Sequence, residues 1–113
     1  MEAARVAVHH GSPRGDMDGL EPEHVDLALA DMLLRKADCD ILVVGHTHRA
    51  FRLDVAGGRS IVNPAALLRD PAPGADNPPA TGTFGVLELP SQEFRVYRAT
   101  DGTEADVPRR VLM

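Results

Sequence analysis

The chain has 113 residues and a formal net charge of −5, from 12 Lys and Arg against 17 Asp and Glu. Its length suits a single domain, and 43% hydrophobic with 26% charged residues is typical of a soluble globular protein rather than a disordered one. The acidic balance argues against bulk electrostatic binding to nucleic acid or to an anionic membrane surface. Apolar runs such as residues 41–44 are too short for a membrane span, and one cysteine fits a reducing cytoplasm. We therefore expect a single cytoplasmic domain over residues 1–113.

The first predicted elements are a strand, a helix and a second strand. Residues 5–8 form a short apolar run that ends in a Gly and Pro loop, which predicts a buried strand. A proline and then apolar residues at helical spacing predict a helix over 22–37, with a buried stripe from Val25 to Leu33. The run at 41–44 predicts a second buried strand. Two buried strands joined by a helix form a parallel pair with a right-handed crossover.

A hairpin and a long loop follow this unit. Residues 51–55 alternate apolar and polar side chains and return as 60–62 after Gly57-Gly58, which suits a two-residue turn. The proline-rich stretch over 64–82 predicts a long irregular loop, of the kind that is usually functional or mobile.

The last third of the sequence predicts a second hairpin and a tail. Residues 84–89 pair with 94–98, and the polar segment from about 100 to 113 is predicted to be a flexible tail. The predicted fold class is therefore α/β, with one β-α-β crossover followed by two β-hairpins.

Histidines follow both strands of the predicted parallel pair. His10 comes after the first strand, and His46 and His48 come after the second. Because ligands bind at the carboxyl edge of open α/β sheets, we expect these imidazoles to converge there. Imidazole is the commonest transition-metal ligand and also the usual general acid or base near neutral pH. In a tight turn, the His46-x-His48 spacing allows the two rings to serve two neighbouring ions.

These histidines stand in motifs that resemble a known family. The segments VHHGSP at 8–13 and VGHTH at 44–48, followed by VNP at 62–64, are similar to the C-terminal half of the calcineurin-like metallophosphoesterases. The resemblance is greatest to the small bacterial and archaeal phosphodiesterase branch, and it extends over residues 5–98. It implies half of an αββα sandwich, so that residues 1–113 form the C-terminal portion of such a domain.

The resemblance also implies an activity and a set of metal ligands. Members of the family are hydrolases that cleave a phosphate monoester or diester through a hydroxide held by two divalent metal ions. By this resemblance His10 and His46 would bind one metal and His48 the other, with ions of the Mn, Fe, Ni or Zn class. No residue is assigned a catalytic role beyond these ligands. Two close metals lower the pKa of bound water and supply the positive charge that an acidic chain lacks.

The chain departs from the family pattern in the motifs that precede His10. The family's N-terminal half supplies an Asp-x-His pair, a bridging Asp in a Gly-Asp motif and an Asn-His pair, and none stands before residue 10 here. The family's Asn-Pro-Gly-Ser turn is Asn63-Pro64-Ala65-Ala66 in this chain. We therefore expect the chain alone to be weakly active or inactive. The alternative is a non-catalytic truncated homologue that acts as a binding or assembly module with at most one metal.

Three further residues are candidates for supporting roles at the site. Asn63 could orient a metal ligand, or it could simply form the turn before a proline. Arg14 could bind a phosphate through two nitrogens, or it could be a generic surface charge. Thr47 is expected to satisfy backbone groups of its turn rather than contact the substrate.

The expected partners follow from the implied activity and from burial. The substrate would be a small phosphate ester, with no bulk nucleic-acid or membrane binding. Half of a two-sheet sandwich leaves an apolar sheet face uncovered. We therefore expect self-association or a complementing N-terminal half.

Overall fold

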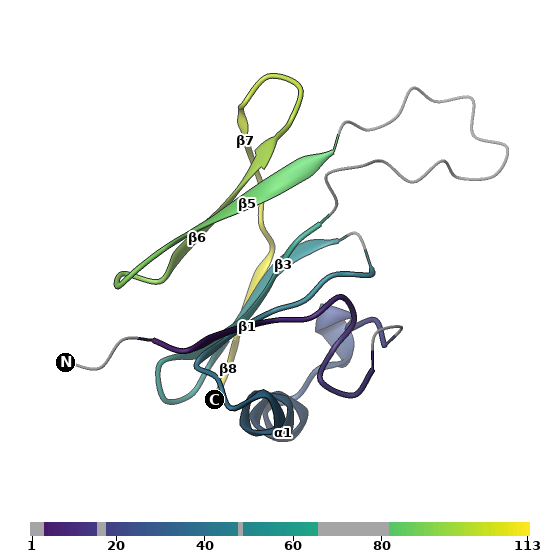
Figure 1. The fold of residues 1–113 in the computed structure, drawn as a ribbon, viewed down its shortest axis with the longest axis vertical. Helices are drawn as coiled ribbons and strands as arrows, with labels where there is room; N and C mark the ends of the chain where they lie inside the picture. Colours follow the sequence, from purple (N-terminus) through teal and green to yellow (C-terminus); the bar gives the residue numbers. More distant parts are fainter. Residues whose placement is uncertain (1–3, 16–17, 48, 66–81) are drawn as a thin grey trace, which may run out of the picture.

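The computed structural model describes residues 4–15, 18–47, 49–65 and 82–113. The elements in chain order are β1 (Val6–Val8), the 3-10 helix η1 (Pro22–His24), α1 (Leu27–Ala37), β2 (Ile41–Val43), β3 (Ala50–Val55), β4 (Arg59–Pro64), β5 (Thr83–Glu88), β6 (Glu93–Arg98), β7 (Glu104–Ala105) and β8 (Arg109–Leu112). The strands form a five-stranded sheet in the order β1-β2-β4-β3-β8 and a three-stranded sheet in the order β5-β6-β7. Figure 1 shows α1 and the smaller sheet on opposite sides of the larger one.

The predicted β-α-β unit is present and sets the architecture of the larger sheet. β1 and β2 pair in parallel, with Val6 opposite Ile41 and Val8 opposite Val43. β4 adds a second parallel pairing on the other side of β2. Short runs of Val, Ile and Leu form these strands because branched side chains pack well on a pleated surface. The mixed α/β class is thereby confirmed.

The helix begins later than its sequence pattern indicates. Residues 22–24 form a separate 3-10 turn, and Val25 has an extended backbone. Asp26 then caps α1, because its side chain accepts a hydrogen bond from the backbone N–H of Leu29 at 2.8 Å. The predicted single helix over 22–37 is therefore wrong in its first turn, where the capping aspartate rather than the proline sets the start.

This later start also corrects the predicted buried face. The buried residues of α1 are Ala30, Leu33 and Leu34, whereas Met32 is 41% exposed. Val25 is buried as predicted, but it reaches the core from the segment before the helix. The buried face of α1 is thus displaced by one residue toward the C-terminus from the predicted face.

Both predicted hairpins are confirmed, with one difference in the first turn. β3 and β4 pair antiparallel with Val55 opposite Arg59, so the turn holds three residues, Ala56, Gly57 and Gly58, rather than two. Both glycines have positive φ, which side chains other than glycine rarely adopt. β5 and β6 form the second hairpin. Of the predicted loop over 64–82, residues 66–81 lie outside the described residues.

The segment after residue 100 differs from the predicted flexible tail. β8 pairs in parallel with β3, with Val55 opposite Leu112, and Leu112 is buried. Arg110 donates from Nη1 to the carbonyl oxygens of Pro22 at 2.8 Å and Val25 at 2.9 Å. The polar residues that suggest a tail in the sequence are instead used to attach this strand to β3 and η1.

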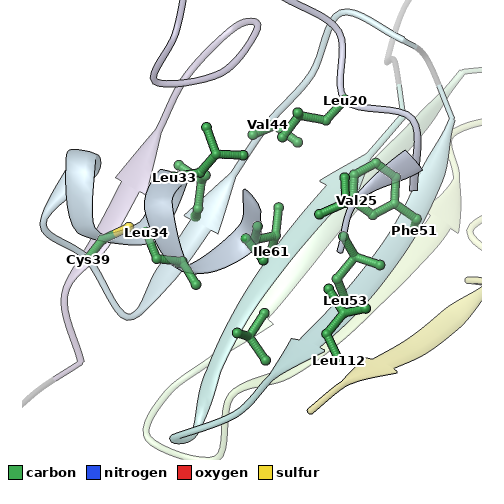
Figure 2. Packing of buried hydrophobic residues seen from close by; sticks show 13 residues of the cluster. Leu20, Val25, Leu33, Leu34, Cys39, Val44, Phe51, Leu53, Ile61 and Leu112 are labelled. Atoms are coloured by element: carbon green, nitrogen blue, oxygen red, sulfur yellow. The ribbon is translucent and has the colours of Figure 1, made fainter. Parts of the chain in front are cut away.

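Two separate apolar layers result. The main core lies between α1 and the larger sheet and includes Leu33, Leu53 and Ile61 (Figure 2). Ile41 and Val62 are fully buried but lie outside that cluster, as does Val96 from the smaller sheet. Among the described residues, no helix has the length and apolar character that a membrane crossing requires.

The β1 side of the larger sheet is less covered than its centre. β1 is an edge strand, and its Val6 and Val8 side chains are 41% and 73% exposed. The neighbouring Ile41 on β2 is fully buried by comparison. An edge strand with exposed apolar side chains is a surface on which another chain can pack.

Candidate metal centre

His10 and His46 follow the carboxyl ends of β1 and β2. The parallel ladder continues past both strands, since the backbone N–H of His9 donates to Val43 and that of Gly45 donates to His10, each at 2.9 Å. These two bonds hold the two loops side by side. The predicted meeting of His10 and His46 therefore follows directly from the parallel pairing of short apolar strands.

The two imidazoles are adjacent. His10 Nε2 and His46 Nδ1 lie 3.3 Å apart, with ring centroids at 5.3 Å and ring planes at 72°. Two nitrogens that bind one tetrahedral metal at roughly 2.0–2.1 Å each are themselves separated by about 3.3 Å. The spacing thus suits two ligands of a single ion, and it also suits a hydrogen bond from one neutral ring to the other.

The described residues supply two candidate ligands rather than a complete centre. Among them, no three His, Cys, Asp or Glu side chains gather closely enough to hold a metal ion. His48 lies outside the described residues, so its predicted binding to a second metal stays a prediction. Because structural and catalytic metal sites usually have three or four protein ligands, a stable centre here needs ligands beyond His10 and His46.

The backbone at His46 is in the left-handed region. Its φ is +72°, which is uncommon for a residue other than glycine, although histidine adopts it more readily than most. The backbone N–H of Thr47 donates to the carbonyl of Gly45 at 2.9 Å and closes the turn around His46. Such a conformation costs on the order of 1 kcal/mol or more and persists where surrounding contacts hold it.

Asn63 lies at the end of β4 and is fully buried. Its Nδ2 donates to Thr47 Oγ1 at 3.1 Å and to the carbonyl oxygen of Gly45 at 3.4 Å. Its Oδ1 accepts from the backbone N–H of Ala65 at 2.8 Å. Asn63 therefore forms the turn at Pro64, which is one of the two roles that the sequence left open, and its amide also contacts the turn that carries His46.

A second set of contacts surrounds the loop after His10. The buried Ser12 donates its hydroxyl to Asp18 and accepts from the backbone N–H of Arg14 at 3.0 Å. Arg14 Nε donates to the same carboxylate at 2.7 Å. The hydroxyl of Ser12 holds the pKa of Asp18 below its ordinary value; partial burial opposes the shift, and Arg14 adds to it. Arg14, a predicted phosphate contact, is thus oriented through its Nε by a carboxylate of its own loop.

This loop packs directly on the His46 turn through Gly19. A Cβ at Gly19 would lie 2.9 Å from Thr47 Cγ2, closer than real Cβ contacts come, and 3.0 Å from His46 Cδ2, tighter than nearly all of them. Glycine therefore favours the close approach of the loop to the ring, and a larger residue would push Thr47 or His46 aside. The sequence reasoning missed Ser12, Asp18 and Gly19. The bond between Ser12 and Asp18 closes one loop, the contact of Gly19 joins that loop to another, and no local spacing marks either of them.

No family model and no curated protein matches the chain. Among solved structures, the chain is similar to hypothetical protein PH1004 from Pyrococcus horikoshii OT3, with a TM-score of 0.62 and 17% identity. It is similar to Vps29 complexed with Zn²⁺ from Entamoeba histolytica, with a TM-score of 0.54 and 25% identity. It is also similar to a metallophosphoesterase from Sphaerobacter thermophilus, with a TM-score of 0.52 and 24% identity. This chain has part of the metallophosphoesterase fold.

The shared part is nearly all of this chain but a limited share of the others. The alignments cover 91%, 92% and 87% of this chain, against 37%, 56% and 45% of those solved chains in the same order. The metallophosphoesterase resemblance found in the sequence motifs is thereby confirmed for the fold. For this chain, the activity, substrate and partners of a complete metallophosphoesterase are therefore proposals.

Proposed function

We infer that this chain forms part of a metal-dependent phosphoesterase, in which His10 and His46 hold one divalent cation and His48 a second. The observation that carries the inference is the 3.3 Å separation of His10 Nε2 and His46 Nδ1 at the carboxyl edge of the larger sheet. The metallophosphoesterase fold supports it, as does the solved Vps29 complex with Zn²⁺. The proposed substrate is a small phosphate monoester or diester.

The residues of the site have distinct roles in this proposal. His10 and His46 bind as neutral rings through the two facing nitrogens, so that their ring protons stay on His10 Nδ1 and His46 Nε2. Divalent ions, when bound, neutralise phosphate charge and lower the pKa of a coordinated water. Arg14 follows His10 by four residues, and its guanidinium is held by Asp18 in the loop that borders His46. We assign it to the phosphate of the substrate.

The remaining ligands are proposed to come from residues outside the 113 of this chain, either in the same domain or in a complementing polypeptide. This proposal rests on the metal-ligand count within the described residues and on the limited share of the similar solved chains that the alignments cover. We place the reaction in a reducing cytoplasm, which the single cysteine, Cys39, supports.

The test is Zn²⁺ and Mn²⁺ binding to the purified chain by titration calorimetry, for the wild type, His46→Ala and His24→Ala. His24 is the matched control because it is exposed at the end of η1. We expect His46→Ala to weaken binding at least tenfold, and His24→Ala to bind as the wild type does. Equal binding by all three proteins would refute the metal-ligand role of His46.

Hydrolysis of a chromogenic phosphodiester with Mn²⁺ tests whether this chain alone holds all the metal ligands that the reaction needs. We expect little turnover by the chain alone, because two or three imidazoles do not complete a dinuclear centre. Robust turnover that His46→Ala abolishes would show that this chain needs no further ligands.

A second candidate function is a non-catalytic binding or assembly module with at most one metal. The observation in its favour is that the described residues gather only two candidate ligands. Metal stoichiometry separates the two functions. The phosphoesterase binds two ions per active site once its partner segment is present, whereas the module binds at most one and hydrolyses no phosphate ester.

A further inference from the structure

Two turns with left-handed backbones lie at the ends of neighbouring parallel strands. His46 follows β2 with φ +72°, and Ala65 follows β4 with φ +65°. Neither residue is a glycine, so each turn holds a conformation that its own side chain disfavours. A conformation of this kind is stable only where neighbouring groups fix it.

The side chain of Asn63 bonds to both turns. Its Oδ1 accepts from the N–H of Ala65, and its Nδ2 donates to the hydroxyl of Thr47 and the carbonyl of Gly45, on either side of His46. Only an amide provides an acceptor and two donors on one short side chain. An aspartate would keep the bond from Ala65 and lose both donors, while a leucine of similar size would lose all three bonds.

The other side of the His46 turn is fixed by packing. Gly19 approaches Thr47 and the His46 ring so closely that a Cβ there would clash with both. The turn is therefore held between the amide of Asn63 and the backbone of Gly19. A shift toward Gly19 is blocked by contact, and a shift away from Asn63 breaks hydrogen bonds of a fully buried amide, which is costly because that amide is left without partners.

We propose that Asn63 is a positioning residue, which holds the imidazole of His46 beside that of His10 in the orientation that binds a metal. It acts through Thr47 and Gly45 rather than by touching the ion. The inference rests on the proposed function for its metal, but the placement of the two rings can be measured without one.

The experiment compares Asn63→Leu and Thr47→Val with two controls. Asn63→Leu removes the amide from one side of the contact, and Thr47→Val removes the hydroxyl from the other. Thr47→Ser restores the hydroxyl. Ser60→Ala is the matched control on β4, because Ser60 is buried like Asn63 but its Oγ has no hydrogen-bond partner among the described residues.

Two measurements are made on each variant. NMR detects the nuclear Overhauser effect between the ring protons of His10 and His46, whose centroids are 5.3 Å apart. Calorimetry measures the affinity for Zn²⁺ alone. We expect Asn63→Leu and Thr47→Val to lose the ring contact and to bind Zn²⁺ about tenfold more weakly. Ser60→Ala keeps both properties of the wild type, and Thr47→Ser, which keeps the hydroxyl but loses the methyl beside Gly19, lies closer to the wild type than Thr47→Val in both properties.

A purely structural role predicts a different pattern. If Asn63→Leu lowers the unfolding midpoint but keeps the ring contact and the wild-type Zn²⁺ affinity, the proposal is overturned. If Asn63→Leu does not fold, Thr47→Val decides the question by the same two readouts. A wild-type chain that shows the ring contact but binds no Zn²⁺ would contradict the proposed function, while the ring contact in the variants still decides the positioning role.

Discussion

The two sheets of this molecule differ in how they are covered. The larger sheet is covered by α1, and Leu53 and Ile61 are fully buried between them. The smaller sheet turns one face to the larger and the other to solvent, so that Phe84 and Val86 are about two-fifths exposed. The histidine pair stands on the larger sheet, with His46 after the interior strand β2 and His10 after the less covered edge strand β1. His46 is therefore carried by the part of the molecule that packing holds most firmly, and His10 by its edge.

Left-handed backbone occurs in turns of both sheets. His46 and Ala65 follow β2 and β4 at the centre of the larger sheet, whereas Gln92, with φ +63°, lies in the turn between β5 and β6. Neighbouring strands on both sides of β2 and β4 fix the ends that carry His46 and Ala65. Strain close to a binding site persists where the surrounding structure determines the backbone.

The largest expected effect on the free energy of unfolding comes from replacing a leucine by alanine in each of the two sheets. Leu53→Ala opens a cavity in the main core and is expected to lower the free energy of unfolding by about 2–5 kcal/mol. Leu87→Ala on β5 removes a half-buried side chain and is expected to cost about 1 kcal/mol. Urea denaturation followed by circular dichroism measures both. Equal losses would show that the two sheets are packed alike.

A smaller effect is expected from the polar link between β3 and β8. Asp54 accepts from Arg52 Nε at 2.9 Å and from Arg109 Nε. Partial burial opposes ionisation, but the two guanidinium groups outweigh it and lower the pKa of Asp54. A carboxylate with a lowered pKa stabilises the fold above its unfolded value of about 4, and this contribution is lost as the pH falls through the folded value.

The variant Asp54→Asn tests this link. We expect it to lower the free energy of unfolding by about 1–2 kcal/mol at pH 7 and to flatten the loss of stability between pH 5 and about pH 2. Asp106→Asn, on the exposed segment after β7, is the control. Urea denaturation across this pH range measures the effect, and an unchanged pH profile would contradict it.

The smallest expected effect is a gain in stability at Ala65. Its φ of +65° suits glycine, so Ala65→Gly is expected to raise the free energy of unfolding by about 0.5–1 kcal/mol. Gly58→Ala is the opposite control, since Gly58 has φ +73° and a Cβ there would meet open space. That variant should lose about 1 kcal/mol through backbone strain alone. Thermal unfolding compares the two, and a loss at Ala65→Gly would show that the alanine methyl makes contacts worth more than its strain.

The sequence predicted those parts of the fold that depend on local pattern and on general topology. Short apolar runs placed β1 and β2, and the parallel crossover then brought His10 and His46 to one edge. It failed where one local signal competed with another. A proline suggested a helix start that Asp26 sets four residues later, and the charged residues of β8 concealed a strand.

The supporting contacts of the site were beyond sequence reasoning for a different reason. Ser12 bonds to Asp18 across its own loop, Gly19 reaches the His46 turn through space, and Asn63 bonds to residues on a different strand end. Such contacts depend on how separate loops pack, which no spacing along the chain encodes. The family motif has glycine where this chain has Ala65, and the left-handed backbone of Ala65, with φ +65°, is one that glycine adopts most readily.

The path of the last ten residues has a consequence for how the molecule opens. The chain leaves the smaller sheet at β7 and enters the larger sheet at β8, where Pro108 accepts a hydrogen bond from the backbone N–H of Arg52 at 2.9 Å. The smaller sheet therefore cannot swing away as a free hairpin without stretching or releasing β8. Although the smaller sheet is loosely packed, it belongs to the same cooperative unit as the larger sheet, which carries the two histidines. We therefore expect the amide protons of the smaller sheet to exchange together with those of β8 rather than before them.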